Sequence, residues 1–222
     1  MKVVLTDIDE TRLEKAVYSF KESGGNVLGV PMDVSDDRQV QALAQKTLDH
    51  FGAIHVLCNN AGVAYTVRSS WETPIEVWQW VLDVNLMGVV HGIQTFMPIM
   101  PAQNNEAHVL NTASVAGLTK NVFNVPYGVS KHAVVALSES LHLEFLFRNA
   151  KIKVSVLCPG PVNTDIMQSS QRLLPDTVLP PPELTPERPC FAGLMKSGSS
   201  AVWTPVRSPV RFSRLSAKNA FL

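Results

Sequence analysis

The chain has 222 residues, 45% of them hydrophobic and 17% charged, which excludes an intrinsically disordered protein. Basic and acidic residues both number 19, and this balance argues against a nucleic-acid-binding protein, which would show a basic excess. No apolar run reaches the roughly 18 residues of a membrane span. Met1 directly precedes a strand pattern, so we expect no signal peptide.

Five short apolar segments have the pattern of buried strands. They are rich in Val, Ile and Leu without strict polar alternation, which is typical of parallel strands covered on both faces. These segments are Val3–Thr6, Asn26–Val30, Ile54–Cys58, His108–Thr112 and Lys153–Leu157.

The first two helical patterns are predicted between these strands. Glu10–Glu22 has an apolar stripe, and the glycines that follow at 24 and 25 end it. Ser35 is the expected cap of the next helix, which Gly52 ends.

Two longer helices follow. Thr73–Glu76 has the sequence of a capping box with proline at the first helical position, and we expect its helix to run to about Met97. Another helix is expected from about Pro126 to Asn149. The alternation of strands and helices predicts a single-domain, doubly wound α/β fold with a parallel sheet.

The end of the chain differs in composition from the rest. Six prolines between Pro175 and Pro189 predict a loop, and we expect a substrate loop over about 163–187. No acidic residue follows Glu187, so residues 188–222 form an atypical basic tail, which is either a variable terminus or the product of a disturbed reading frame. We therefore place an incomplete domain at 1–187 and the tail at 188–222.

The three cysteines indicate whether the protein works in a reducing or an oxidising cell compartment. Cys58, Cys158 and Cys190 are odd in number and widely spaced, and they form no CxxC pair. Free thiols in a reducing, cytoplasmic setting are therefore expected, and we expect no metal site.

A tyrosine and a lysine could carry acid–base chemistry. Tyr127 and Lys131 are four residues apart at the start of a predicted helix, on one face. A neighbouring ammonium is expected to lower the tyrosine pKa and make the hydroxyl a usable acid or base. Taken alone, the pair is more often an ordinary helix surface pair.

Polar residues near predicted strand ends could bind a ligand. Ser114 lies just past one strand, where ligands bind in open α/β sheets. Asn59–Gly62 follows another strand, although a turn would also explain it. Asn85 lies inside an apolar helix and needs a hydrogen-bonding partner or a function.

Together these residues resemble the classical short-chain dehydrogenase/reductase family. The motifs that carry the likeness are Asn59-Asn60-Ala61-Gly62, Asn85, Ser114, Tyr127 with Lys131, and Pro159-Gly160-Pro161-Val162-Asn163-Thr164. Ser114 precedes Tyr127 by thirteen positions, as the family pattern requires. The likeness covers roughly residues 2–187.

The resemblance implies a Rossmann-like oxidoreductase that uses a nicotinamide cofactor on a secondary alcohol or ketone. Tyr127 would transfer the proton, Lys131 would lower its pKa and hold the nicotinamide ribose, Ser114 would orient the carbonyl, and Asn85 would hold a water. Apolar residues of the expected loop suggest a small apolar substrate; they are Met167, Leu173, Leu174, Val178 and Leu179.

The resemblance also implies a set of cofactor-binding residues. Asp7 would bind the adenosine ribose, and its carboxylate would repel a 2′-phosphate, which favours NAD over NADP. The other implied contacts are Asp33, Val34, Asn60, Ala61, Gly62, Tyr127, Lys131, Pro159, Gly160, Val162 and Thr164.

The sequence departs from the family at the phosphate-binding turn. No G-x-G occurs in the chain, and the family strand that would precede this turn has no counterpart before Val3. In the family sheet that strand lies between those ending here at Thr6 and Cys58, so both would lack a partner. We therefore expect a chain truncated at its first strand.

Three functions remain open. The first is an NAD-linked enzyme, a homodimer or homotetramer assembled through the helices that start near Pro74 and Pro126. The second is an inactive fragment that only associates with other subunits. The third treats the basic tail as a nucleic-acid or acidic-membrane contact, which has little support because no aromatic residues are interleaved with the charges.

Overall fold

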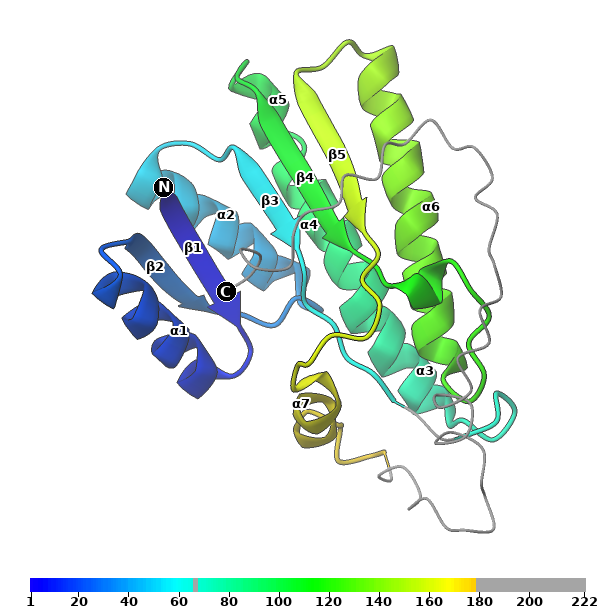
Figure 1. Ribbon diagram of the computed structural model, residues 1–222. Helices are drawn as coiled ribbons and strands as arrows, with labels where there is room; N and C mark the ends of the chain where they lie inside the picture. The colour runs from blue at the N-terminus through cyan, green and yellow to red at the C-terminus, as the bar shows by residue number, and fades with distance from the viewer. Residues whose placement is uncertain (66–67, 179–222) are drawn as a thin grey trace.

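The computed structural model describes residues 1–65 and 68–178, and strands and helices alternate along this part (Figure 1). In chain order the elements are β1 (Lys2–Asp7), α1 (Glu10–Glu22), β2 (Asn26–Pro31), α2 (Asp37–Phe51), β3 (Val56–Asn59), α3 (Ile75–Leu82), η1 (Asp83–Met87), α4 (Gly88–Phe96), α5 (Ile99–Ala102), β4 (Ala107–Thr112), η2 (Val115–Gly117), α6 (Val125–Phe147), β5 (Ile152–Leu157) and α7 (Ile166–Arg172). The predicted α/β class is confirmed. The expected boundary at 187 and the tail at 188–222 lie outside the described residues.

The strands form two separate parallel sheets. One has the order β1–β2, with Val4 opposite Leu28, and the other has the order β3–β4–β5, with Leu57 opposite Val109. β1 and β3 face each other but belong to different sheets, as the sequence predicts (Figure 1).

The third strand begins at Val56 and not at Ile54. The Gln103 side chain accepts a hydrogen bond from the Ile54 N–H at 2.8 Å and donates one to the Ile54 carbonyl at 2.7 Å. Because a side chain satisfies both backbone groups, Ile54 needs no strand partner.

The first two helices have the expected lengths, but the predicted cap of α2 is wrong. The residue at its amino end is Asp36, whose carboxylate accepts a hydrogen bond from the Arg38 N–H. Ser35 instead donates its hydroxyl proton to Asp33 at 2.7 Å. Gly52 ends α2 in the left-handed region at φ 81°, which a glycine adopts without strain.

The predicted capping box at Thr73–Glu76 is also wrong. Pro74 precedes the first helical residue, and Thr73 donates its hydroxyl to the Ser69 carbonyl. The long helix runs from Ile75 to Phe96 but is interrupted by the π-helical turn η1, which sequence patterning does not show. None of the described helices is both long and apolar enough to traverse a lipid bilayer.

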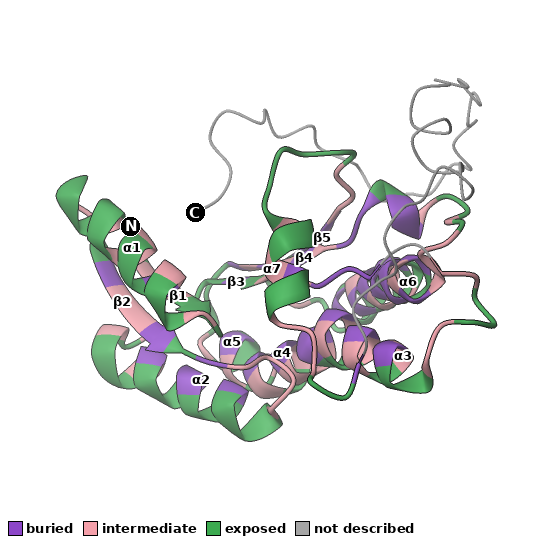
Figure 2. Cartoon of the chain, turned by 90° about the horizontal axis from the view of Figure 1, so that it is seen from below, coloured by how far each residue is buried: buried purple, intermediate pink, exposed green. Residues whose placement is uncertain are grey.

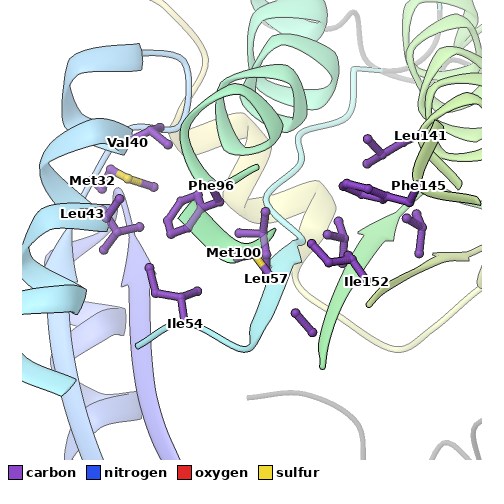
Figure 3. Close-up of a cluster of buried hydrophobic side chains, with 14 of the residues drawn as sticks. Met32, Val40, Leu43, Ile54, Leu57, Phe96, Met100, Leu141, Phe145 and Ile152 are labelled. Atoms are coloured by element: carbon purple, nitrogen blue, oxygen red, sulfur yellow. The ribbon is translucent and has the colours of Figure 1, made fainter. Parts of the chain in front are cut away.

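One hydrophobic core connects the two sheets on one side. Its members include Met32 after β2, Val40 and Leu43 of α2, Leu57 of β3 and Phe96 of α4 (Figure 3). The same cluster continues to β4, β5 and α6. The two sheets are therefore joined by side chains of α2 and α4, in place of hydrogen bonds between strands.

Burial is uneven across the molecule. α6 has nine buried residues, whereas α1 has one, Leu13 (Figure 2). The three-stranded sheet and its helices therefore contain most of the close packing, and the two-stranded unit lies at their side.

Candidate active site

A cavity of about 710 Å³ lies between β1 and β3, near the carboxyl ends of both strands. In open α/β sheets this edge is where ligands bind. Its walls come from the end of β1, the loop after β2, β3 with the loop that follows it, α4 and α7. The cavity is therefore placed where the two sheets meet.

Asn85 lies in the π-helical turn and is fully buried. Its amide oxygen accepts a hydrogen bond from the Val63 N–H at 2.8 Å, and its amide nitrogen donates to the Val63 carbonyl and to Ser130 Oγ. These bonds hold the loop after β3 against α6. The π-turn, common at functional sites, presents this side chain to that loop.

A serine that follows β4 lies beside a tyrosine and a lysine in the first turns of α6. They are Ser114, Tyr127 and Lys131. Ser114 is buried just after β4 and accepts a hydrogen bond from the Ala116 N–H. Its side chain also hydrogen-bonds to the half-buried Tyr127. Lys131 Nζ lies 5.6 Å from the centre of the Tyr127 ring and donates to the Thr112 carbonyl at 2.9 Å.

Burial is the largest influence on the pKa values of Tyr127 and Lys131. It raises the pKa of Tyr127, and the hydrogen bond from Ser114 lowers that pKa by less. The expectation that Lys131 would bring the tyrosine pKa below its usual value is therefore wrong for this structure, because desolvation of the phenolate outweighs the other effects. Burial also lowers the pKa of Lys131 to about 8.

Gly62 connects the Tyr127 group to the cavity. It lines the cavity with Asn60 and Ala61, and a Cβ on it would lie 3.3 Å from Asn85 Oδ1 and 3.4 Å from Lys131 Nζ. Asn60 accepts a hydrogen bond from Thr112 Oγ1 at 3.0 Å. The three residues of this loop therefore separate the cavity from Asn85 and Lys131.

Three predicted adenosine contacts also line the cavity. Asp7 lies at the end of β1 and accepts a hydrogen bond from the Asp9 N–H. Asp33 accepts bonds from the Ser35 backbone and hydroxyl, and the Val34 carbonyl bonds to His91. The Asp7 carboxylate thus remains available for hydroxyl groups of a ligand.

The predicted contacts after β5 are not brought to the cavity. The Pro159 carbonyl accepts a hydrogen bond from the Val115 N–H, while Gly160, Val162 and Thr164 are exposed. None of the described residues that line the cavity comes from 159–164.

The apolar residues of the expected substrate loop lie in different parts of the structure. Leu174 and Val178 pack into a small core with Val63 and Val77 and do not line the cavity. Leu173 lines the cavity, Met167 is exposed and Leu179 lies outside the described residues. These residues therefore support an apolar substrate less than the sequence suggests.

A short chain dehydrogenase family model matches residues 1–173. The chain belongs to the short-chain dehydrogenase family. A dehydrogenase/reductase of CLA biosynthesis from Lactiplantibacillus plantarum is 37% identical over 166 residues, which cover 75% of this chain and 58% of that protein. A 1-deoxy-11-beta-hydroxypentalenate dehydrogenase from Streptomyces exfoliatus is 35% identical, over 75% of this chain and 60% of that protein. This short-chain dehydrogenase chain thus spans less than two thirds of these curated relatives.

Solved structures of the family have the same fold. A short-chain dehydrogenase/reductase from Burkholderia phymatum in complex with NAD matches with a TM-score of 0.80 and 40% identity, over 91% of this chain and 72% of that one. A levodione reductase matches with a TM-score of 0.71 and 30% identity, over 79% of this chain and 68% of that one.

In this short-chain dehydrogenase chain, sequence reasoning missed two groups of residues. Arg12 and Arg172 line the cavity, and Arg12 also forms an ion pair with Asp165 at 2.8 Å. Asn59 donates to Asn111, which donates to Ser138 in α6. Both groups depend on contacts between distant segments, and although Asn59 lies in a recognised motif, the motif does not indicate its bond to Asn111.

Proposed function

We propose that the chain is the catalytic part of an NAD-linked oxidoreductase that interconverts a secondary alcohol and a ketone. The observation that carries the proposal is the group of Ser114, Tyr127 and Lys131, whose lysine lies behind the Asn60–Gly62 loop that lines a cavity at the carboxyl edge of the strands. Membership of the short-chain dehydrogenase family supports the same reaction.

Tyr127 acts as the acid when a ketone is reduced. Since burial raises its pKa, the hydroxyl is protonated at neutral pH and can donate its proton to the oxygen of the carbonyl group. Lys131, with a pKa of about 8, is mostly charged at neutral pH and favours the phenolate that remains. Ser114 hydrogen-bonds the substrate oxygen, and Asn85 holds the loop that carries Gly62.

The residues on the cavity walls fit the two ends of NAD. Asp7 would bind the adenosine ribose, Asp33 and Val34 would flank the adenine, and Asn60, Ala61 and Gly62 would line the cofactor. Pro159, Gly160 and Thr164 remain proposed contacts at the nicotinamide side, and Val162 remains a proposed cofactor contact. When bound, NAD supplies the hydride acceptor and NADH the hydride donor. The Asp7 carboxylate disfavours NADP by repelling its 2′-phosphate.

The substrate and the assembly are part of the proposal. A small, apolar alcohol or ketone is supported by Leu173 on the cavity wall. A homodimer or homotetramer through the helices that start near Pro74 and Pro126 is supported by exposed apolar residues of α6, of which Phe147 is 88% exposed.

A second candidate is a chain without activity that only associates with other subunits. The separation of β1 from β3 favours it, because the two walls of the cavity are not held together by a shared sheet. Calorimetric titration of the folded chain with NADH distinguishes the two. A saturable heat with one site per chain supports the enzyme, and no heat from a folded sample contradicts it.

A further inference from the structure

Two hydrogen bonds join residues 1–52 to the rest of the chain that the structure describes. One runs from Arg12 to Asp165 at 2.8 Å, and its side chains are 39% and 68% exposed. The other joins the ring of His91 in α4 to the Val34 carbonyl at 2.9 Å and is partly buried. Water screens the first bond, so the second is the stronger constraint on how the two parts meet.

The second bond holds a residue that is proposed to contact the adenine. Val34 lies in the loop between β2 and α2 and lines the cavity. Because a carbonyl oxygen can only accept, His91 Nδ1 carries the hydrogen and donates it. The two residues are 57 positions apart, so the bond fixes the loop against a distant helix.

A glycine one turn before His91 lets the Val34 side chain approach α4. A Cβ on Gly88 would lie 2.8 Å from Val34 Cγ2 and 3.0 Å from Val34 Cβ. Residues three apart in a helix share one face, so Gly88 and His91 meet the same loop. The bare glycine receives the side chain of Val34, and the imidazole holds its carbonyl.

The other bonds of this loop stay within the loop and α2. Asp33 accepts hydrogen bonds from the Ser35 backbone and hydroxyl, and its own N–H donates to Gln39 at 3.0 Å. The Asp36 N–H donates to the Asp33 carbonyl. These bonds shape the turn but do not attach it to α4. The attachment therefore depends on Val34.

The His91 ring lies beside a groove, outside the hydrophobic core. α2 and α4 pack side by side, and a groove of about 310 Å³ between them is lined by His91 together with Asp37 and Gln41 of α2 (Figure 2). A substitution at His91 should therefore disturb the bond to Val34 more than the packing of the fold.

We propose that His91 is a positioning residue for the adenine half of NAD. It acts through Val34, which it holds against the bare backbone of Gly88, and so fixes the wall that the adenine would contact. This inference rests on the proposed function, which takes Val34 as an adenine contact. Affinity for the adenine end should depend on His91, whereas proton transfer at Tyr127 should not.

The test compares two replacements of similar shape. His91→Asn keeps a side-chain N–H near the place of Nδ1, and His91→Leu has no donor. The probe is ADP-ribose, which has the adenine and the pyrophosphate but no nicotinamide, and its binding is measured by titration calorimetry.

The loss should follow the hydrogen bond. His91→Leu should bind ADP-ribose at least about fivefold more weakly than the parent chain, because the Val34 carbonyl loses its partner and the loop shifts. His91→Asn should stay within about twofold of the parent, since the donor remains. His142→Leu in α6, which does not line the cavity, is the control and should bind as the parent does.

Three further measurements separate positioning from a general loss of structure. Without ligand, His91→Leu should speed amide exchange at Ser35 and Asp36 and leave β4 unchanged. With NADH as the varied reactant, KM should rise while kcat keeps its parent value. Gly88→Ala fills the space that Val34 occupies and should also weaken ADP-ribose binding, although alanine suits a helix better than glycine.

Parent affinity for ADP-ribose in His91→Leu would overturn the inference and leave the proposed function intact. Equal weakening in His91→Asn and His91→Leu, or faster exchange in β4 as well, would also overturn it. A parent chain that binds NADH but not ADP-ribose would do the same. A parent chain that binds neither would contradict the proposed function, and this inference would fail with it.

Discussion

The two sheets of this chain differ in how they are held together. The β3–β4–β5 unit is covered by α4 and α6 and contains the fully buried side chains of Met100, Val109 and Val134. The β1–β2 unit has an amphipathic helix with a single buried residue, Leu13. The first unit carries the proposed acid–base residues and the second carries Asp7, the proposed ribose contact. The proposed function therefore requires that a well-packed unit and a lightly packed unit stay at a fixed distance from each other.

The largest expected effect is a loss of catalytic rate that does not come from a loss of packing. Tyr127→Phe removes the proton donor in the larger unit and should lower ketone reduction with NADH about 10²- to 10⁴-fold. Tyr18→Phe, at an exposed position of α1, is the matched control and should leave the rate unchanged. Steady-state kinetics with both variants checks this. A Tyr127→Phe enzyme with the parent rate would remove Tyr127 from the mechanism.

The second prediction tests the difference in packing directly. Met100→Ala leaves a cavity in the shared core and should lower the free energy of unfolding by about 2–5 kcal/mol. Leu13→Ala should have a smaller effect on global unfolding while speeding amide exchange in β1 and β2. Urea denaturation measures the global free energy of unfolding, and hydrogen exchange measures local opening of β1 and β2. Equal loss of global stability in both variants would mean that the units unfold as one.

The third prediction concerns pH. Lys131 has a folded-state pKa of about 8, below its usual 10.5, so the unfolded chain binds more protons between these values. Stability from this group therefore rises as pH increases from about 8 to 10.5, by at most roughly 3 kcal/mol. Lys131→Met should remove that rise in denaturation curves recorded across the range. A rise of the same size in the variant would assign it to other groups.

The smallest effect tests the start of α2, which joins the two units. Asp36→Ala removes the capping carboxylate and should cost about 1 kcal/mol of stability. Ser35→Ala, one residue earlier, should cost less, since its hydroxyl bonds only to Asp33. Thermal denaturation of the pair compares them, and the reverse order would restore Ser35 as the cap.

The strands and the location of the site could be predicted because they depend on local sequence. Short Val- and Ile-rich runs indicate β1 to β5, and the motif residues Ser114, Tyr127 and Lys131 follow from their spacing. The π-turn at Asn85 could not be predicted, because it accompanies bonds to Val63 and Ser130 that lie far away in sequence. The cap at Asp36 was missed because Ser35 suits the same role, and only the bond to Asp33 shows that its hydroxyl is used elsewhere.

The pKa of Tyr127 is another property that the sequence alone does not predict. A Tyr–Lys spacing of four predicts a lowered tyrosine pKa, but the extent of burial depends on the whole fold and raises it. The neighbouring charge is visible in the sequence, whereas desolvation is not.

The central claim is that the cavity between the two units binds NAD through Asp7. Titration calorimetry of Asp7→Ala with NADH tests it most directly, with Asp49→Ala of α2 as the matched control. The account predicts binding of NADH at least about tenfold weaker in Asp7→Ala, parent affinity in Asp49→Ala, and less preference for NADH over NADPH once the carboxylate is gone. Equal affinity for NADH in the parent chain and Asp7→Ala would contradict it.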